Sequence, residues 1–215
     1  MGNVRTDLSV IAGIIFFPLI LGGCISIPDS PAPRFYALEA GEEHADAVSP
    51  SILSDVIVGV GPVKIPGYQD RPQIVTQSKD MTLNFAQFDR WGEALGAGVA
   101  RLIREGLTAK LAGAKVMAFP WSFSVPVKYQ VTVEIVRLNS DLDREVNLVA
   151  QWMIIDARNT RTLLVTRSEF HQSLITKDYH GLVKALGMAC TSLSGEIAKE
   201  LVALESSSPV IPKYN

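Results

Sequence analysis

The sequence predicts one α/β domain, in which a mixed β-sheet packs against two long helices. Short strand-like runs come first, a stretch with apolar residues at helical spacing follows, and three longer alternating runs precede a second helical stretch. This order of strands, helix, antiparallel strands and helix is typical of a sheet covered by helices. Residues 24–215 are enough for one domain with a sizeable core, and they contain no internal repeat.

The N-terminus has the pattern of a bacterial lipoprotein signal peptide. Arg5 precedes a mostly apolar run over residues 8–21, and the run ends in Leu21-Gly22-Gly23-Cys24. We therefore expect a signal peptide over residues 1–23, which is cleaved off, and a mature chain that begins at an acylated Cys24. Acyl chains hold a protein on a membrane because each buried CH₂ contributes roughly 0.8 kcal/mol. This covalent lipid is the only non-protein group that we expect, and no cofactor is predicted.

Two alternative interpretations explain less of this segment. An N-myristoylation signal at Gly2 leaves the apolar run without a role. A transmembrane anchor needs about 20 apolar residues, and this run is shorter and is interrupted by Gly13 and Pro18. Residue 25 is Ile rather than Asp, which in a Gram-negative cell permits sorting to the outer membrane. We therefore expect a lipid anchor in the outer membrane, with the domain facing the periplasm.

The composition disfavours several classes of protein. The formal net charge is −2 and there is no basic stripe, so nucleic-acid binding is not expected. The histidines His44, His171 and His180 lack the spacing of a metal site. No Gly-x-Ser-x-Gly motif or cysteine–histidine pattern supplies a nucleophile, so an enzyme is not expected either. Cys190 lies among apolar residues at helical spacing and is predicted to be a small buried hydrophobe.

The first half of the mature chain is predicted to hold a tether, four short strands and one helix. Residues 24–50 form a proline-rich tether with a possible strand at 34–38, and the domain proper covers 51–205. Further strands are predicted at 56–63, 73–77 and 81–85. Apolar residues at helical spacing predict a helix over 91–112, with Trp91 on its apolar face and Gly113 as its stop.

The second half is predicted to hold three longer strands and a second helix. The strands are expected at 127–138, 146–156 and 163–171, each with one apolar face. Asp178 is expected to cap the final helix, whose apolar stripe runs from Leu182 to Leu201. Residues 206–215, rich in serine and proline, are predicted to be a disordered tail.

Two segments carry unusual residue combinations. Lys64 to Gln73 places two prolines, a glycine, an aromatic residue and charged residues between two strands. It is either a rigid connection or a recognition loop, and the residues alone do not decide between these. Phe85 to Trp91 places Arg90 beside aromatic residues. Arg90 and Trp91 either stack at an interface or begin the helix core.

Both segments resemble signatures of the ABC-type transport auxiliary lipoproteins, a family that includes the paraquat-inducible protein C lipoproteins. The first signature is similar to Val58-Gly59-Val60-Gly61-Pro62-Val63-Lys64-Ile65-Pro66-Gly67-Tyr68 followed by Asp70-Arg71-Pro72-Gln73-Ile74-Val75. The second is similar to Phe88-Asp89-Arg90-Trp91-Gly92-Glu93-Ala94-Leu95, and Arg34-Phe35-Tyr36-Ala37-Leu38 matches a short aromatic motif after the lipidated cysteine. The resemblance covers residues 34–203. Gln69 departs from it, because an aliphatic residue is expected there.

The resemblance implies a fold like the anticodon-binding and TolB N-terminal folds, and a role beside a mammalian-cell-entry-type (MCE) protein and inner-membrane transporter components. Such systems move lipids between the two membranes of a Gram-negative envelope. A homo-oligomeric ring around the end of the partner is also an implication of the family. We therefore expect a non-enzymatic docking subunit of a lipid transporter, with Tyr68, Asp70, Arg71, Arg90 and Trp91 as partner-binding residues.

Two other functions compete with this expectation. A lipid-binding carrier would enclose an apolar cavity between the sheet and the helices, but the sequence has no surplus of apolar positions for one. An envelope hydrolase would need a nucleophile and a base, which no pattern in the chain supplies.

Overall fold

The structure is a computed structural model that describes residues 30–41 and 53–207. Its strands and helices all belong to the compact unit Pro33–Asn215. The predicted signal peptide, Cys24, most of the tether, much of the following loop and the tail from residue 208 lie outside the described residues. The predictions made for those segments therefore remain predictions.

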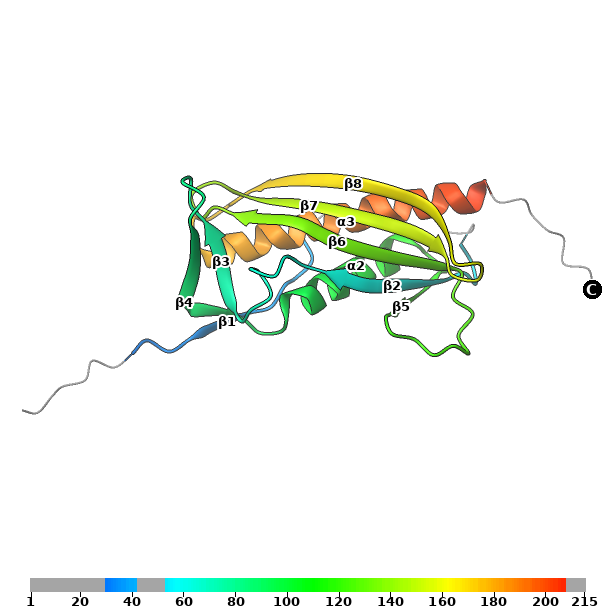
Figure 1. The fold of residues 1–215 in the computed structure, drawn as a ribbon, viewed down its shortest axis with the longest axis horizontal. Helices are drawn as coiled ribbons and strands as arrows, with labels where there is room; N and C mark the ends of the chain where they lie inside the picture. Colours follow the sequence, from blue (N-terminus) through cyan, green and yellow to red (C-terminus); the bar gives the residue numbers. More distant parts are fainter. Residues whose placement is uncertain (1–29, 42–52, 208–215) are drawn as a thin grey trace, which may run out of the picture. The chain divides into compact units, whose positions relative to one another are not determined.

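A five-stranded mixed sheet forms the larger layer of the fold, in the order β5-β2-β6-β7-β8. Its strands are β2 (Ile57–Lys64), β5 (Lys115–Ala118), β6 (Tyr129–Ser140), β7 (Glu145–Asp156) and β8 (Arg161–Ser173). β2 runs parallel to both β5 and β6, while β6, β7 and β8 pair antiparallel. Figure 1 shows these long strands side by side.

A three-stranded mixed sheet stands at one end of the larger one (Figure 1), in the order β1-β4-β3. Its strands are β1 (Arg34–Tyr36), β3 (Gln73–Gln77) and β4 (Leu83–Trp91). The predicted single sheet is therefore divided in two. The chain leaves β2 at Lys64, turns through the proline-containing loop, and enters β3, which pairs with β4 rather than with β2.

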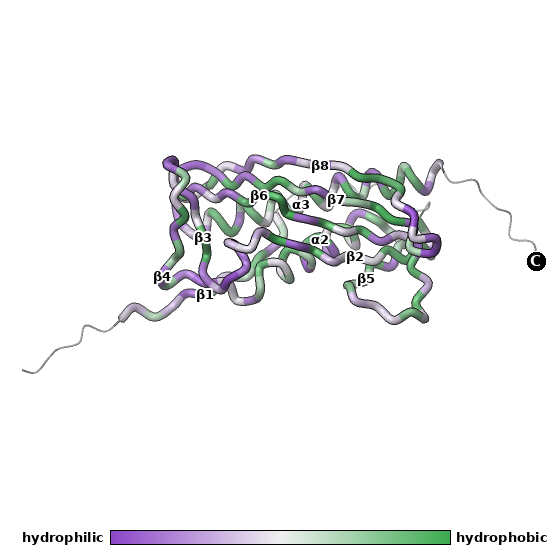
Figure 2. Tube along the Cα trace, in the orientation of Figure 1, coloured by the Kyte–Doolittle hydropathy of each residue, from purple (hydrophilic) through white to green (hydrophobic). Residues whose placement is uncertain are grey.

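Both helices cover the same face of the five-stranded sheet (Figure 1). α2 (Leu95–Lys110) contacts β2 and β5, α3 (Tyr179–Ser206) contacts β7 and β8, and the two helices pack on each other. The core between them is apolar, and its fully buried members include Ile103, Leu107, Val131, Leu148, Leu186, Leu193 and Ile197. Figure 2 shows apolar and polar residues interleaved along the strands, as expected of a sheet with one buried face.

The fold class and most elements agree with the sequence prediction. β3 has the predicted bounds, β2 and the three long strands lie within two residues of theirs, and the predicted apolar faces of β6 and β7 are buried. Asp178 caps α3, because its Oδ1 accepts a hydrogen bond from Gly181 N at 2.8 Å. Cys190 is fully buried in α3, and this burial raises the pKa of its thiol to about 12.

Three boundaries were predicted wrongly. The helix over 91–112 begins at Leu95 and ends at Lys110, because β4 continues through Trp91 instead of ending at Phe85. The pairing of β4 with β1 through residues 89–91 supplies backbone hydrogen bonds that a lone sequence pattern does not reveal. β5 was missed altogether, since only four residues form it, too few for a periodic signal.

None of the helices in the described part of the chain is both long enough and apolar enough to cross a membrane.

Candidate docking surface

Hydrogen bonds within the loop between β2 and β3, and from this loop to β6, fix the loop in place. Gln69 N donates to Pro66 O at 2.8 Å and Asp70 N donates to Gly67 O, which closes tight turns in the loop. The Tyr68 hydroxyl and the Gln69 side-chain amide both donate to Leu138 O on β6, at 3.2 and 2.9 Å. Gln69 is only 2 % exposed. The loop is therefore a rigid connection tied to the neighbouring sheet.

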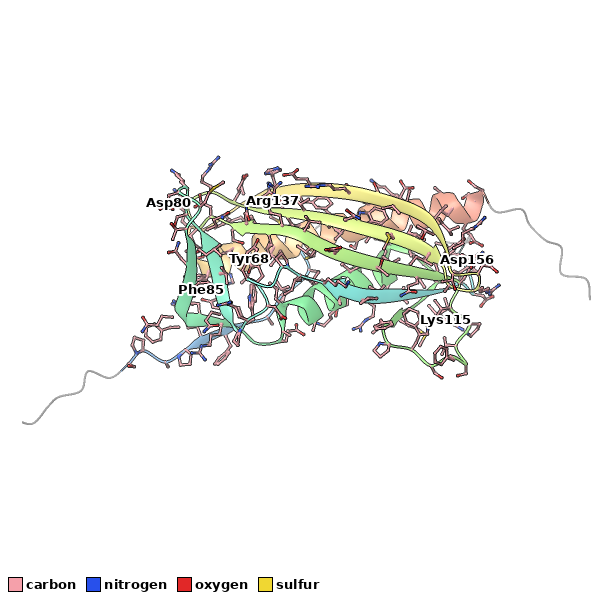
Figure 3. The ribbon with its side chains drawn as sticks, in the orientation of Figure 1. Tyr68, Asp80, Phe85, Lys115, Arg137 and Asp156 are labelled. Carbon is pink, nitrogen blue, oxygen red and sulfur yellow. The ribbon has the colours of Figure 1, made fainter. Side chains whose placement is uncertain are left out.

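The other side of the same loop is exposed. Asp70 and Arg71 face solvent, and the guanidinium carbon of Arg71 lies 4.4 Å from the ring centroid of Phe85 on β4. Phe85 is 48 % exposed. A cation over an exposed aromatic ring is a common arrangement at protein interfaces, because Arg and aromatic residues can be desolvated there with little loss of entropy. Figure 3 shows Tyr68 and Phe85 at the same end of the molecule.

A buried carboxylate joins β1 to this region. Asp89 on β4 is 5 % exposed and accepts hydrogen bonds from Arg34 Nε at 2.8 Å, Arg34 Nη2 at 3.0 Å and the Tyr36 hydroxyl at 2.8 Å. Asp89 raises the pKa of the Arg34 guanidinium through its hydrogen bond and its charge. Burial and the hydrogen bond to Asp89 raise the pKa of Tyr36. This cluster fixes the start of the domain to the three-stranded sheet.

Arg90 and Trp91 occupy different environments, although they are adjacent. Arg90 is half-buried and lies between Phe35 and Gln73 in the register of the sheet. Its Nε atom is buried and has no hydrogen-bond partner in the described structure. Trp91 is 7 % exposed and belongs to the core, and its backbone N donates to Pro72 O at 2.7 Å. Trp91 therefore supports the strand and the loop from within.

We use the name docking surface for five residues that are at least partly exposed on the small sheet and its loop: Phe35, Asp70, Arg71, Phe85 and Arg90. Sequence reasoning named three of them, and it missed Phe35 and Phe85. Both lie in segments that the sequence had marked as aromatic motifs, but only the structure shows that they are exposed, at 65% and 48%. Asp89 was also missed, because its partners are more than fifty residues away in the chain.

Two surface grooves accompany these features. One, of about 600 Å³, lies beside Phe35, between residues 35–41 and the first turns of α3, and is lined by Val183, Lys184 and Met188 among others. The other, of about 410 Å³, lies between α2 and the strands β2 and β5. Within residues 30–41 and 53–207, no three His, Cys, Asp or Glu side chains are grouped so that they could hold a metal ion.

Comparison with known proteins gives a family and a fold. The family model described as ABC-type transport auxiliary lipoprotein component matches residues 36–198. A solved structure of an uncharacterized protein is 18% identical, with a TM-score of 0.62, over 80% of this chain and 99% of its own. A solved protein from Xanthomonas campestris is 14% identical with the same TM-score, over 81% of this chain and 99% of its own. A comparison with curated proteins gives no match.

Proposed function

Because this chain belongs to the family of ABC-type transport auxiliary lipoprotein components, we propose that it is the docking subunit of a lipid transporter of the cell envelope. In this proposal, Cys24 carries the lipid that anchors the chain in the outer membrane. The domain faces the periplasm and binds an MCE-type protein, which connects it to inner-membrane transporter components. The role is one of binding and not of catalysis.

The pair formed by Arg71 and Phe85 carries the proposal. It combines a cation, an exposed aromatic ring and a loop that is already ordered by Tyr68 and Gln69. An ordered loop loses little conformational entropy on binding, so its contacts contribute more to affinity than those of a flexible one. Asp70 and Arg90 add charges of both signs beside the pair, and these favour a polar partner surface over a bare lipid surface.

Tyr68 and Trp91 have supporting parts in this proposal. The Tyr68 hydroxyl bonds to Leu138 O and holds the loop, while Trp91 is buried beneath the end of β4. We assign direct contact with the partner to Arg71 and Phe85, with Asp70 and Arg90 at the rim. Copies of the chain could then surround the end of the partner as a ring, which is the arrangement that the family resemblance suggests.

A co-purification experiment tests the proposal. The lipidated protein is isolated from detergent-solubilised envelopes, and the proteins that accompany it are identified by mass spectrometry. We expect an MCE-domain protein. Arg71→Ala and Phe85→Ala should each weaken its binding about tenfold, which corresponds to about 1.4 kcal/mol, while leaving the melting temperature unchanged.

Arg161→Ala is the matched control. Arg161 is an exposed arginine at the start of β8, in register with Asp156, which lies at the opposite end of the molecule from Phe85 (Figure 3). Its replacement should leave the co-purified amount unchanged. Equal losses in all three variants, or losses matched by lower melting temperatures, would refute the assignment of the docking surface.

The competing function, a lipid-binding carrier, has less support. The space between the helices and the five-stranded sheet is filled by side chains of zero to a few per cent exposure. The two grooves described above are open at the surface. Native mass spectrometry of the extracted protein decides the matter, because a carrier would retain a bound lipid in addition to the covalent one.

A further inference from the structure

The connection between β5 and β6 exposes aromatic residues without any charge among them. Residues 116–127 contain no Asp, Glu, Lys, Arg or His, but they include Phe119, Trp121 and Phe123. Phe123 is fully exposed and Phe119 is 48% exposed. The rest of the segment consists of serines, prolines and small or aliphatic residues. We call residues 119–126 the aromatic loop.

The aromatic loop is held in a defined shape. The Trp121 ring lies so close over Gly59 on β2 that a Cβ at residue 59 would come within 2.5 Å of it. Phe119 packs edge-on against Trp121, with ring centroids 5.5 Å apart, and its backbone N donates to Val60 O at 2.9 Å. The turn is closed by Val125 N, which donates to Ser122 O at 3.0 Å. Phe123 is thus presented outward by a braced loop and does not fold back onto the domain.

Cationic side chains border the aromatic loop. Arg104 on α2 lines the same groove as Phe119, and the described structure gives it no ion pair. Lys115 is exposed at the start of β5, at the opposite end of the molecule from Phe85 (Figure 3). Aromatic rings at the level of the headgroups, flanked by Lys and Arg that meet anionic lipids, are typical of segments that lie in the membrane interface.

We propose that the aromatic loop is a second membrane contact, in which Phe123 enters the boundary between lipid headgroups and acyl chains. This inference rests on the proposed lipid anchor at Cys24, because the anchor keeps the bilayer near the domain at all times. The weak attraction of one or two aromatic side chains is then sufficient to orient the domain, since the second contact forms within one molecule. A protein partner is the alternative occupant, and the test below separates the two.

The length of the chain permits both contacts at once. Tyr36 packs against Tyr179 at the start of α3, and Lys128, just after the aromatic loop, pairs with Glu205 near its end. β1 and the aromatic loop are therefore about 40 Å apart along the helix. The ten residues from Cys24 to Pro33 span at most about 35 Å. The lipid on Cys24 and the aromatic loop can therefore contact the same bilayer only when α3 lies along the membrane or is inclined to it. They cannot do so when α3 is perpendicular to the membrane.

Tryptophan fluorescence tests the contact in the full lipidated chain. The protein is reconstituted in vesicles of phosphatidylcholine and phosphatidylglycerol, with or without bromine on the acyl chains of the phosphatidylcholine. Trp91 and Trp152 are 7% and 1% exposed, so lipid bromine does not reach them. Trp121 lies in the aromatic loop itself, so Trp121→Phe is introduced into every variant. Phe123→Trp places a reporter at the tip of the aromatic loop. Val165→Trp is the matched control, because Val165 is 54% exposed on β8, at the opposite edge of the five-stranded sheet from β5 and the aromatic loop.

We expect the added emission of Phe123→Trp to shift to shorter wavelength on reconstitution and to be quenched by the brominated lipid, and that of Val165→Trp to do neither. If the protein floats with the vesicles but the Phe123→Trp emission stays at the wavelength of a water-exposed tryptophan and is not quenched, the proposed membrane contact is overturned. The proposed lipid anchor at Cys24 would not be contradicted by that result. A blue shift that appears only when the co-purified partner is added would also overturn the proposed membrane contact. Failure to float with the vesicles would contradict the lipid anchor itself, and with it both proposals.

Discussion

The buried carboxylate of Asp89 fixes β1, the first strand of the domain, to β4. Its two carboxylate oxygens receive three hydrogen bonds from Arg34 and Tyr36, and the two residues come from the strand that directly follows the predicted tether. A tether that carries a membrane anchor needs such a fixed point, because any pull on it is applied first to β1. The arginine side chain is 67% exposed, so its charge is screened by solvent, and the tyrosine hydrogen bond carries a larger share of the effect.

Asp89→Asn should therefore lower the free energy of unfolding by roughly 1–2 kcal/mol, because an amide accepts fewer and weaker hydrogen bonds than a carboxylate. Urea denaturation measures the change. Tyr36→Phe should account for much of it, since it removes one of the three bonds and keeps the ring against Tyr179. If Arg34→Lys lowers the free energy of unfolding and Tyr36→Phe does not change it, the ion pair between Arg34 and Asp89 contributes more than the tyrosine hydrogen bond.

Cys190 allows a prediction about pH. Burial raises the pKa of its thiol to about 12, whereas an exposed cysteine thiol has a pKa of about 9. The folded state therefore holds the proton more tightly than the unfolded state. The stabilisation is complete below pH 9 and is lost between pH 9 and about 12, where the unfolded thiol ionises first.

We expect the thiol of the acylated protein to resist alkylation at pH 8 and to react fully in denaturant. The free energy of unfolding should fall more steeply above pH 9 in wild type than in Cys190→Ala. Rapid alkylation of the folded protein at pH 8 would contradict the burial of Cys190.

The sequence alone could not predict that Asp89 holds β1 in place or that Gln69 holds the β2–β3 loop. Gln69 stands where the family resemblance favours an aliphatic residue, yet its side-chain amide is buried and donates a hydrogen bond to Leu138 O on β6. Both residues act through partners about seventy and fifty-five positions away. A sequence pattern reports the local period of apolar residues, and it carries no information about such distant partners.

At the level of the elements, the packing of α2 on α3 depends on a glycine. A Cβ added at Gly106 on α2 would overlap the side chain of Ser194 on α3, with the two Cβ atoms 2.7 Å apart. Ser194 is fully buried and its hydroxyl is bonded to Thr191 O, so it has no room to move. The close approach of the two helices is therefore fixed at this point.

Gly106→Ala should destabilise the protein by about 1–3 kcal/mol through overpacking, even though alanine favours helices. Gly195→Ala is the matched control on α3, since the nearest atom to an added Cβ, Lys110 Cε, would lie at 3.5 Å, an ordinary van der Waals distance. We expect that variant to be neutral or to gain up to about 1 kcal/mol. Thermal or urea unfolding compares the two, and similar values for both would show that the helices can separate at little cost.

The sequence predicted long elements better than short ones. The strands of twelve or thirteen residues and the 28-residue helix had a clear period, and both ends of each lie close to the predicted bounds. β5 has four residues and β4 has an irregular register with β3, so neither shows a regular alternation. The division into two sheets follows from β3 pairing with β4, a choice that depends on the turn through the β2–β3 loop.

The described part of the molecule presents three different surfaces. The uncovered face of the five-stranded sheet carries exposed polar rows, such as Glu134, Gln151 and Arg167 in register across β6, β7 and β8. Charged rows of this kind remain hydrated. The docking surface combines aromatic rings with charges at one end of that sheet, and the aromatic loop lies at the other. We propose that the docking surface binds the protein partner and that the aromatic loop contacts the membrane.

The central claim is that the docking surface contacts the MCE-type protein, and site-specific photo-crosslinking in intact envelopes tests it most directly. A photoreactive phenylalanine derivative is placed at Phe85, and at Val165 as the control, since Val165 is 54% exposed on β8. The account predicts that Phe85 forms an adduct with an MCE-domain protein and that Val165 does not. An adduct with that protein from Val165 and none from Phe85 would contradict the account.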